Sequence, residues 1–228
     1  MLEEIATDIW GLRSELRAVP GVYLPLRTTI VRLSDGGLLL HSPIRLDDAQ
    51  AAAVDRLGPV RHIVAPSGFH HLFAGHAKAR WPAAVLTVSP RVVKKRLDLT
   101  AEAVLGQGPC PWPAAELTPL EFEGMPALRE FAFFHGATGS VLLTDAVFNI
   151  AQEKGFLAPL WFRIWGTHHK FAQSGLFRLA IKDKAAAAAS ARRILAWDIK
   201  RVIPCHGEVL AEDAQARLAA AFAPMLGA

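Results

Sequence analysis

The stretch VRHIVAPSGFHHLFAGHAKARWP, residues 60–82, contains the transition from which the fold can be inferred. Its apolar beginning, RHIVAP, has the composition of a buried strand, and a Pro-Ser-Gly sequence interrupts it. The helical spacing of FHHLFAGHAKARW then predicts a helix that Pro82 ends. His70 and His71 stand where this helix is expected to begin. A strand that leads through a turn to paired histidines has the outline of a metal-binding loop.

Strands and helices alternate on both sides of this stretch. Apolar and period-two patterns predict strands in residues 5–11, 28–33, 38–42, 61–66, 84–89, 129–134, 140–149 and 200–210. Helical spacing predicts helices in residues 44–58, 69–81, 182–197 and 211–226, with further helical segments in 150–181. The proline-rich residues 106–119 are expected to form a loop, because strand patterns resume directly after them. This alternation favours an α/β or α+β fold in which helices cover the sheets.

Composition limits the classes of protein to which the chain can belong. Its 228 residues suffice for one large domain or two small ones. The net charge of +4 is spread along the chain except for RVVKKR at residues 91–96, so we expect no nucleic-acid partner. Two cysteines are too few for a disulfide framework.

The chain also lacks the sequence signals of a membrane or secreted protein. No apolar run is long enough to span a bilayer, and the first residues lack the apolar core of a secretory signal. We therefore expect a cytoplasmic protein with no membrane partner, whose partner is a small-molecule substrate. A homodimer is compatible with the sequence, which leaves the oligomeric state open.

Four histidines and one aspartate fall at strand ends or in an apolar strand. Imidazole is a common ligand of zinc and related metals, and ligands often project from the edge of a rigid sheet. Asp145 lies within the apolar sequence VLLTDAVF, where an unpaired buried charge would be costly. A metal would compensate that charge, and the alternatives are a turn cap or a pair with an arginine. The residues with this placement are His70, His71, His135, Asp145 and His206.

The order of these motifs resembles that of the metallo-β-lactamase superfamily over roughly residues 25–210. DRLGPVRHIVAPSGFHH is similar to the helix, Leu-Gly pair and strand that precede the family's THxHxDH motif. HGATGSVLLTDAVF matches its second histidine, Gly-Ser pair and aspartate-bearing strand, and VIPCHG matches its last histidine. The resemblance implies one domain over residues 1–228 with an α+β fold. The expected architecture is a four-layer αββα sandwich of two mixed sheets flanked by helices. In detail the chain is similar to an uncharacterised branch that carries APN…HH, for which no substrate is established.

The departures from the family motif imply a reduced metal site. Aligned with THxHxDH, this chain has Pro66 and Gly68 at the two leading histidines, so His135 alone remains from the first site. The second site is more complete. We expect its ligands to be His70, His71, Asp145 and His206, with His70 replacing a carboxylate. This set suits one divalent metal, zinc first, with iron or manganese as alternatives.

The activity implied by the resemblance is a metal-dependent hydrolase. A metal-activated water would attack an ester, thioester, lactone or phosphoester, while Asp145 or His135 handles the proton. The aromatic segment 156–177 would wall the pocket. The alternative is a degenerate, non-catalytic member that binds a small ligand or a partner, which the loss of two ligands favours.

Four other residues are candidates for positions near the site. His41 stands where the family has its Asp-Thr-Gly turn, and we expect it near the metal without binding it. His168 and His169 either overhang the pocket or form an exposed loop pair. Cys205 is expected to be a core thiol, because neighbouring residues in a strand point to opposite faces.

Overall fold

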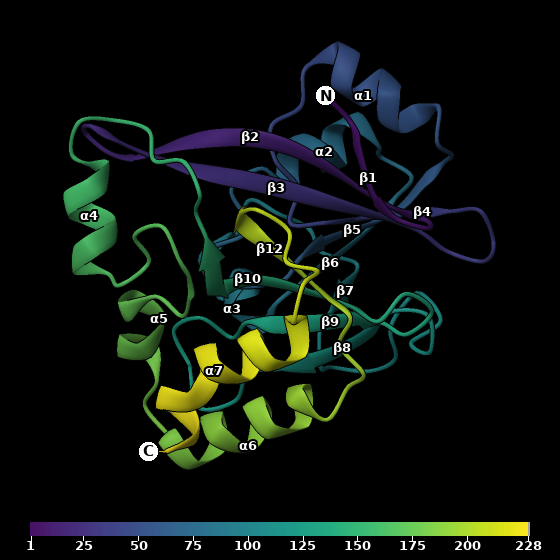
Figure 1. Cartoon of the computed structure of the whole chain (residues 1–228). Helices are drawn as coiled ribbons and strands as arrows, with labels where there is room; N and C mark the ends of the chain where they lie inside the picture. The colour runs from purple at the N-terminus through teal and green to yellow at the C-terminus, as the bar shows by residue number, and fades with distance from the viewer. Residues whose placement is uncertain (228) are drawn as a thin grey trace.

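The computed structural model describes residues 1–227, in which two β-sheets pack face to face between layers of helices (Figure 1). The first sheet contains, in spatial order, β1 (Glu3–Ala6), β2 (Ile9–Val19), β3 (Val22–Arg32), β4 (Leu38–His41), β5 (Val60–Ala65), β6 (Val85–Val88) and β7 (Ala103–Val104). The second contains β11 (Phe171–Ala172), β10 (Ser140–Asn149), β9 (Phe131–His135) and β8 (Thr118–Glu121), and β12 (Arg201–Gly207) also pairs with β10. Both sheets combine parallel and antiparallel pairs.

The helices form the two outer layers. Those on the first sheet are α1 (Asp48–Asp55), α2 (Ala74–Arg80) and α3 (Pro90–Lys95). Those on the second sheet are α5 (Gly175–Ala180), α6 (Lys184–Leu195) and α7 (Ala214–Leu226). Helix α4 (Ala158–Ile164) packs against β3, and Figure 1 shows it beyond the edge of the second sheet. The expected αββα sandwich is therefore confirmed, and residues 150–181 contain short helical segments as predicted.

Apolar side chains fill the space between the sheets as well as the space under the helices. Leu39 and Val64 of the first sheet meet Phe133, Leu142 and Ile203 of the second, and all five are fully buried. Burial of apolar area is the main favourable term in folding, so these inward faces hold the two sheets together. Among residues 1–227, no helix has the length and apolar character needed to cross a lipid bilayer.

The β2–β3 hairpin is much longer than the sequence pattern indicated. Each strand has eleven residues, whereas strands were predicted only at 5–11 and 28–33. The distal half of β2 is exposed or half-buried at nearly every position, so it lacks the alternating apolar pattern by which strands are recognised. Backbone pairing with β3 maintains the strand there. The hairpin therefore extends well beyond the rest of the first sheet (Figure 1).

Helix α2 begins at Ala74 and not at residue 69, which corrects the predicted helix start. The buried Ser67 side chain accepts hydrogen bonds from the backbone N–H groups of Phe69 and His70, at 3.3 and 3.2 Å. A serine that binds the backbone two and three residues ahead stabilises a turn in place of a helix. Gly68 N–H also donates to the Leu128 carbonyl at 2.7 Å, which fixes the turn against the second sheet.

The parallel pairing of β10 with β12 is interrupted where Asp145 lies. Residues 140–143 pair in register with 201–204, and pairing resumes at Phe148 with His206. The register shift between Leu143 and Phe148 leaves the intervening residues outside the ladder. This irregularity places Asp145 and His206 on neighbouring strands at the same end of the sheet.

The end of β12 provides a test of this pairing. Gly207 has φ +104°, and a Cβ atom there would overlap the Asn149 carbonyl of β10. Gly36 has a similar left-handed conformation, φ +79°, but open space around it. We expect Gly36→Ala to destabilise the protein by about 1–2 kcal/mol, the cost of left-handed backbone. Gly207→Ala should cost clearly more, because β12 must also move. Urea unfolding measures both, and equal losses would contradict this account of β12.

Candidate metal centre

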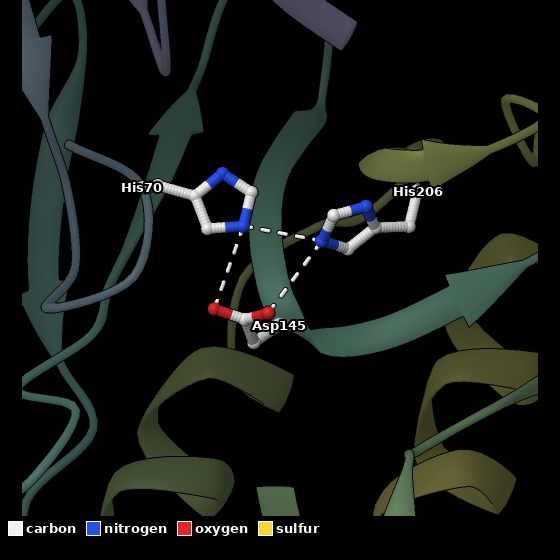
Figure 2. A group of neighbouring side chains, drawn as sticks. All are labelled: His70, Asp145 and His206. Carbon is white, nitrogen blue, oxygen red and sulfur yellow. Dashed lines mark hydrogen bonds and ion pairs between the residues drawn. The ribbon is translucent and has the colours of Figure 1, made fainter. Parts of the chain in front are cut away.

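Three side chains from distant parts of the sequence converge at the end of the second sheet (Figure 2). The Nε2 atoms of His70 and His206 lie 3.1 Å apart. The Asp145 carboxylate completes a triangle, with Oδ2 at 3.4 Å from His70 Nε2 and Oδ1 at 3.5 Å from His206 Nε2. All three are largely buried, with side-chain exposures of 8%, 15% and 2% for His70, Asp145 and His206.

The outer nitrogen of each imidazole is bonded elsewhere, which fixes how the rings are presented. His206 Nδ1–H donates to the Pro25 carbonyl at 2.9 Å, so its Nε2 carries a lone pair directed at the cluster. His70 Nδ1 lies 2.7 Å from the Ser42 hydroxyl. Hydrogen bonds of this kind orient metal-binding histidines and select their tautomer.

The spacing of the three donor atoms fits a metal ion. Ligand atoms about 2.0–2.1 Å from one zinc ion at tetrahedral angles lie roughly 3.3 Å from each other. The two imidazole nitrogens lie 3.1 Å apart, and each lies 3.4–3.5 Å from a different oxygen of the Asp145 carboxylate, close to that value. Two imidazole nitrogens with a carboxylate oxygen also form a donor set that zinc and similar divalent metals prefer. The residues therefore fit a metal held by three protein ligands, with further coordination positions open.

The electrostatics of the cluster favour a bound positive charge. Burial would raise the pKa of Asp145, but His70 and His206 outweigh it and hold that pKa below its usual range. Burial likewise opposes a charge on His70, yet the Asp145 carboxylate raises the pKa of His70 well above its ordinary value. A site that binds a proton this firmly between a histidine and a carboxylate is one where a metal cation can take the proton's place.

A second buried carboxylate, Glu130, fixes the backbone around Asp145. Glu130 is fully buried and accepts hydrogen bonds from the backbone N–H groups of Thr144, Asp145 and Ala146, at 3.0, 3.1 and 3.1 Å. These are the groups that the interruption of β10 frees from sheet pairing. Burial, together with the nearby Asp145 charge, raises the pKa of Glu130 to about 7. The sequence pattern does not indicate this residue, because a glutamate at the start of a strand is usually solvated.

The structure does not bring His71 to the cluster, which corrects the predicted set of four ligands. Arg96 Nη1 donates to His71 Nδ1 at 3.2 Å and to the His71 carbonyl at 3.1 Å. Burial and the neighbouring charges of Lys95 and Arg96 lower the pKa of His71 to about 4, so the ring is neutral. With Nδ1 accepting from arginine, the ring proton resides on Nε2, which is buried and has no hydrogen-bond partner within residues 1–227.

His135 lies at the wrong end of its strand for the predicted role of proton relay. β9 runs antiparallel to β10 and pairs His135 with Ser140, five residues before Asp145. At about 3.3 Å per residue this corresponds to roughly 16 Å along the strand. His135 Nδ1 instead lies 2.9 Å from the Thr138 hydroxyl in the turn. The expected role of His135 at the site is therefore wrong in this structure.

The remaining candidates occupy different surroundings. His41 is fully buried with its ring edge-on to Phe133, and burial followed by the charge of His70 lowers its pKa to about 3. Cys205 is buried, as predicted for a core thiol. His168 and His169 do not line the cavity above the cluster but lie against Glu153.

The cluster forms part of the lining of a mainly apolar cavity of about 320 Å³. The β2–β3 hairpin contributes Leu16, Leu24 and Leu26 to its wall, and the turn after β5 contributes Phe69 and Leu72. Trp161 of α4 and Leu176 of α5 also line the cavity, so the aromatic segment lines the pocket as predicted. Among the described lining residues, Asp145 is the one carboxylate and Lys95 the one lysine or arginine.

Residues 7–160 match a family model described as "Domain of unknown function (DUF4336)". The chain belongs to this family. A comparison with curated proteins finds no match.

Solved structures identify the fold of this DUF4336 protein. It is similar to the metallo-β-lactamase DIM-1 with a TM-score of 0.69 and 11% identity, covering 98% of this chain and 96% of that one. The metallo-β-lactamase from Pontibacter korlensis gives 0.66 and 12%, covering 98% of each chain. FIM-1 from Pseudomonas aeruginosa, a metallo-β-lactamase in its mono-zinc form, gives 0.60 and 15%, covering 99% of this chain and 96% of that one. The resemblance inferred from the motifs is confirmed: the protein has a metallo-β-lactamase-like fold.

Glu130 gives a testable prediction about the support of the site. In Glu130→Gln, one side-chain oxygen remains to accept the three backbone N–H groups that two oxygens accept in the parent protein. The new NH₂ group is itself a donor and would face one of these N–H donors. We expect a loss of about 2–3 kcal/mol in the free energy of unfolding, in the range for buried hydrogen bonds left unsatisfied. Glu121→Gln, which removes a partly exposed ion pair with Arg129, should cost less than about 1 kcal/mol. If the two variants unfold at the same urea concentration, Glu130 does not hold the interruption of β10.

Proposed function

We propose that this protein is a metal-dependent hydrolase of a small, partly apolar molecule. The observation that carries the proposal is the convergence of His70, Asp145 and His206 on one point beside an apolar cavity. A divalent ion held there would supply Lewis acidity, which makes water acidic enough to attack near neutral pH. Zinc suits the donor set best, with iron or manganese as alternatives.

The chain's own residues would position the substrate and handle charge. The Nε2–H of His71, which belongs to the cavity lining, has no hydrogen-bond acceptor among the described residues and can stabilise negative charge that develops on a substrate oxygen. Lys95 Nζ is fixed by the Gly68 carbonyl at 2.9 Å and offers a positive charge to an anionic group. Asp145, as the one carboxylate of the described lining, is the residue proposed to accept the proton from water.

The cavity supports a class of substrate and not a single compound. Its leucine, phenylalanine and tryptophan side chains favour an acyl or aromatic portion, and its polar lining includes the three clustered residues, Ser42 and His71. An ester, thioester, lactone or phosphoester would place its reacting atom at the cluster while the apolar portion contacts the walls.

The second candidate is a non-catalytic member of the fold that binds a small ligand. It is favoured by Pro66 and Gly68 at the positions of two family histidines, and by the bond that ties His71 to Arg96. Elemental analysis of protein purified without a histidine tag distinguishes the two. A stoichiometric metal that His206→Ala loses supports the hydrolase, and its absence supports the binding protein.

Metal content tests the ligand set directly. We expect His206→Ala to lose one metal equivalent per chain, because one of three ligands is removed. His135→Ala should retain that equivalent and also retain turnover on any ester substrate, since His135 lies far from the cluster. Metal analysis and a hydrolase panel measure both. Loss of metal in His135→Ala together with its retention in His206→Ala would invert the assignment.

His71 separates metal binding from catalysis. His71→Phe removes the unpartnered donor, so we expect unchanged metal content and a fall in kcat of roughly 10²–10³, typical of a lost oxyanion donor. His76→Phe is the matched control, because His76 is an exposed histidine of α2 whose Nε2 approaches only the Leu46 carbonyl. The role assigned to His71 is wrong if its variant loses the metal or keeps full turnover.

A further inference from the structure

A second cluster of metal-ligating side chains lies outside the site described above. Glu153 follows β10, and His168 and His169 follow α4. Ligand atoms of all three lie within 4.8 Å of one another. Glu153 Oε1 is 2.7 Å from His168 Nδ1, and Glu153 Oε2 is 3.9 Å from His169 Nε2.

The Glu153 carboxylate is buried but only half of it has a partner. Its side chain is 3% exposed, and Oε2 has no hydrogen-bond partner among the described residues. His169 donates from Nδ1 to the Ala151 carbonyl at 2.9 Å, which leaves a lone pair on Nε2. With His169 neutral, two acceptor atoms, Glu153 Oε2 and His169 Nε2, therefore face each other at 3.9 Å with no donor from residues 1–227 between them. A cation is the species that this arrangement lacks.

The backbone holds both parts of the cluster in place. Tyr23 N–H donates to the Lys154 carbonyl and Leu157 N–H to the Gly21 carbonyl, both at 3.0 Å, so the segment with Glu153 is tied to the β2–β3 turn. His168 N–H donates to the Phe162 carbonyl at 3.1 Å, which closes the end of α4. His169 itself has φ +48°, a strained conformation for a residue other than glycine. Strain of this kind persists where other interactions fix a side chain's direction.

We propose that Glu153, His168 and His169 form a second metal-binding site for a zinc-class divalent cation. One carboxylate oxygen and two imidazole nitrogens suit zinc, cobalt or nickel better than calcium or magnesium, which prefer oxygen ligands alone. The half-exposed His169 leaves an approach from solvent, with open positions for water. A bound ion would join the end of β10 to the end of α4, whose Trp161 lines the cavity, so the site is structural and fixes that wall.

The site is independent of the proposed hydrolase, and a titration separates the two. The full chain, purified without a histidine tag and stripped by a chelator, is titrated with Zn²⁺ alone. The same titration is made on His206→Ala, in which the first centre is disabled. We expect His206→Ala to retain one zinc equivalent, and Glu153→Gln added to it to remove that equivalent. Co²⁺ should give visible absorption bands in His206→Ala that Glu153→Gln abolishes.

Two further variants keep the test decisive. His169→Asn removes an exposed ligand and keeps a residue type that tolerates left-handed backbone, so it should remove the same equivalent without unfolding the chain. His76→Ala is the control, an exposed histidine outside both clusters, and should change nothing. The proposal is overturned if His206→Ala binds no zinc, or if its equivalent survives both Glu153→Gln and His169→Asn. The parent protein could also bind a single zinc equivalent that is lost in His169→Asn and retained in His206→Ala. That result would support this second site and contradict the first centre.

Discussion

The interruption of β10 is the constraint on which the rest of the site depends. A continuous parallel ladder between β10 and β12 would commit the backbone of residues 144–147 to pairing and hold Asp145 in the regular alternation of the strand. The register shift releases that backbone, and buried N–H groups must find another acceptor. Glu130 supplies it for three consecutive residues. Asp145 is thereby held in a position that a regular strand would not offer.

This arrangement places two carboxylates in a buried region that little water reaches. Glu130 and Asp145 are both carboxylates beside the same segment, and water screens them little. The structure balances them with the N–H groups around Glu130 and with the two imidazoles that face Asp145. A divalent cation at the triangle of donor atoms would complete the balance more fully than a proton does. The charge distribution and the donor spacing thus point to the same occupant by separate physical arguments.

The same strand geometry also decides which histidines take part. His70 is aimed at the cluster because Ser67 holds a turn where a helix was expected, and Ser42 then fixes the ring. One residue further along, His71 turns toward α3 and is held by Arg96. Neighbours in sequence therefore have different chemistry: the imidazole of His70 is paired with the Asp145 carboxylate, and the neutral imidazole of His71 carries its proton beside the cavity.

Apolar periodicity in the sequence indicated most of the strands and an α/β or α+β fold, because it follows directly from which face of each element is buried. The layered αββα architecture was implied by the resemblance of the ordered motifs to the metallo-β-lactamase superfamily. The sequence also marked His70, Asp145 and His206 as candidates, since ligand residue types within or beside apolar runs are visible without a structure. It could not show which edge of a sheet each end belongs to. His135 also ends a strand, but antiparallel pairing carries it to the other edge. Glu130, Ser42 and the long β2–β3 hairpin were likewise decided by tertiary structure. Their roles depend on hydrogen bonds to segments far away in the chain, and such partners leave no local pattern in the sequence.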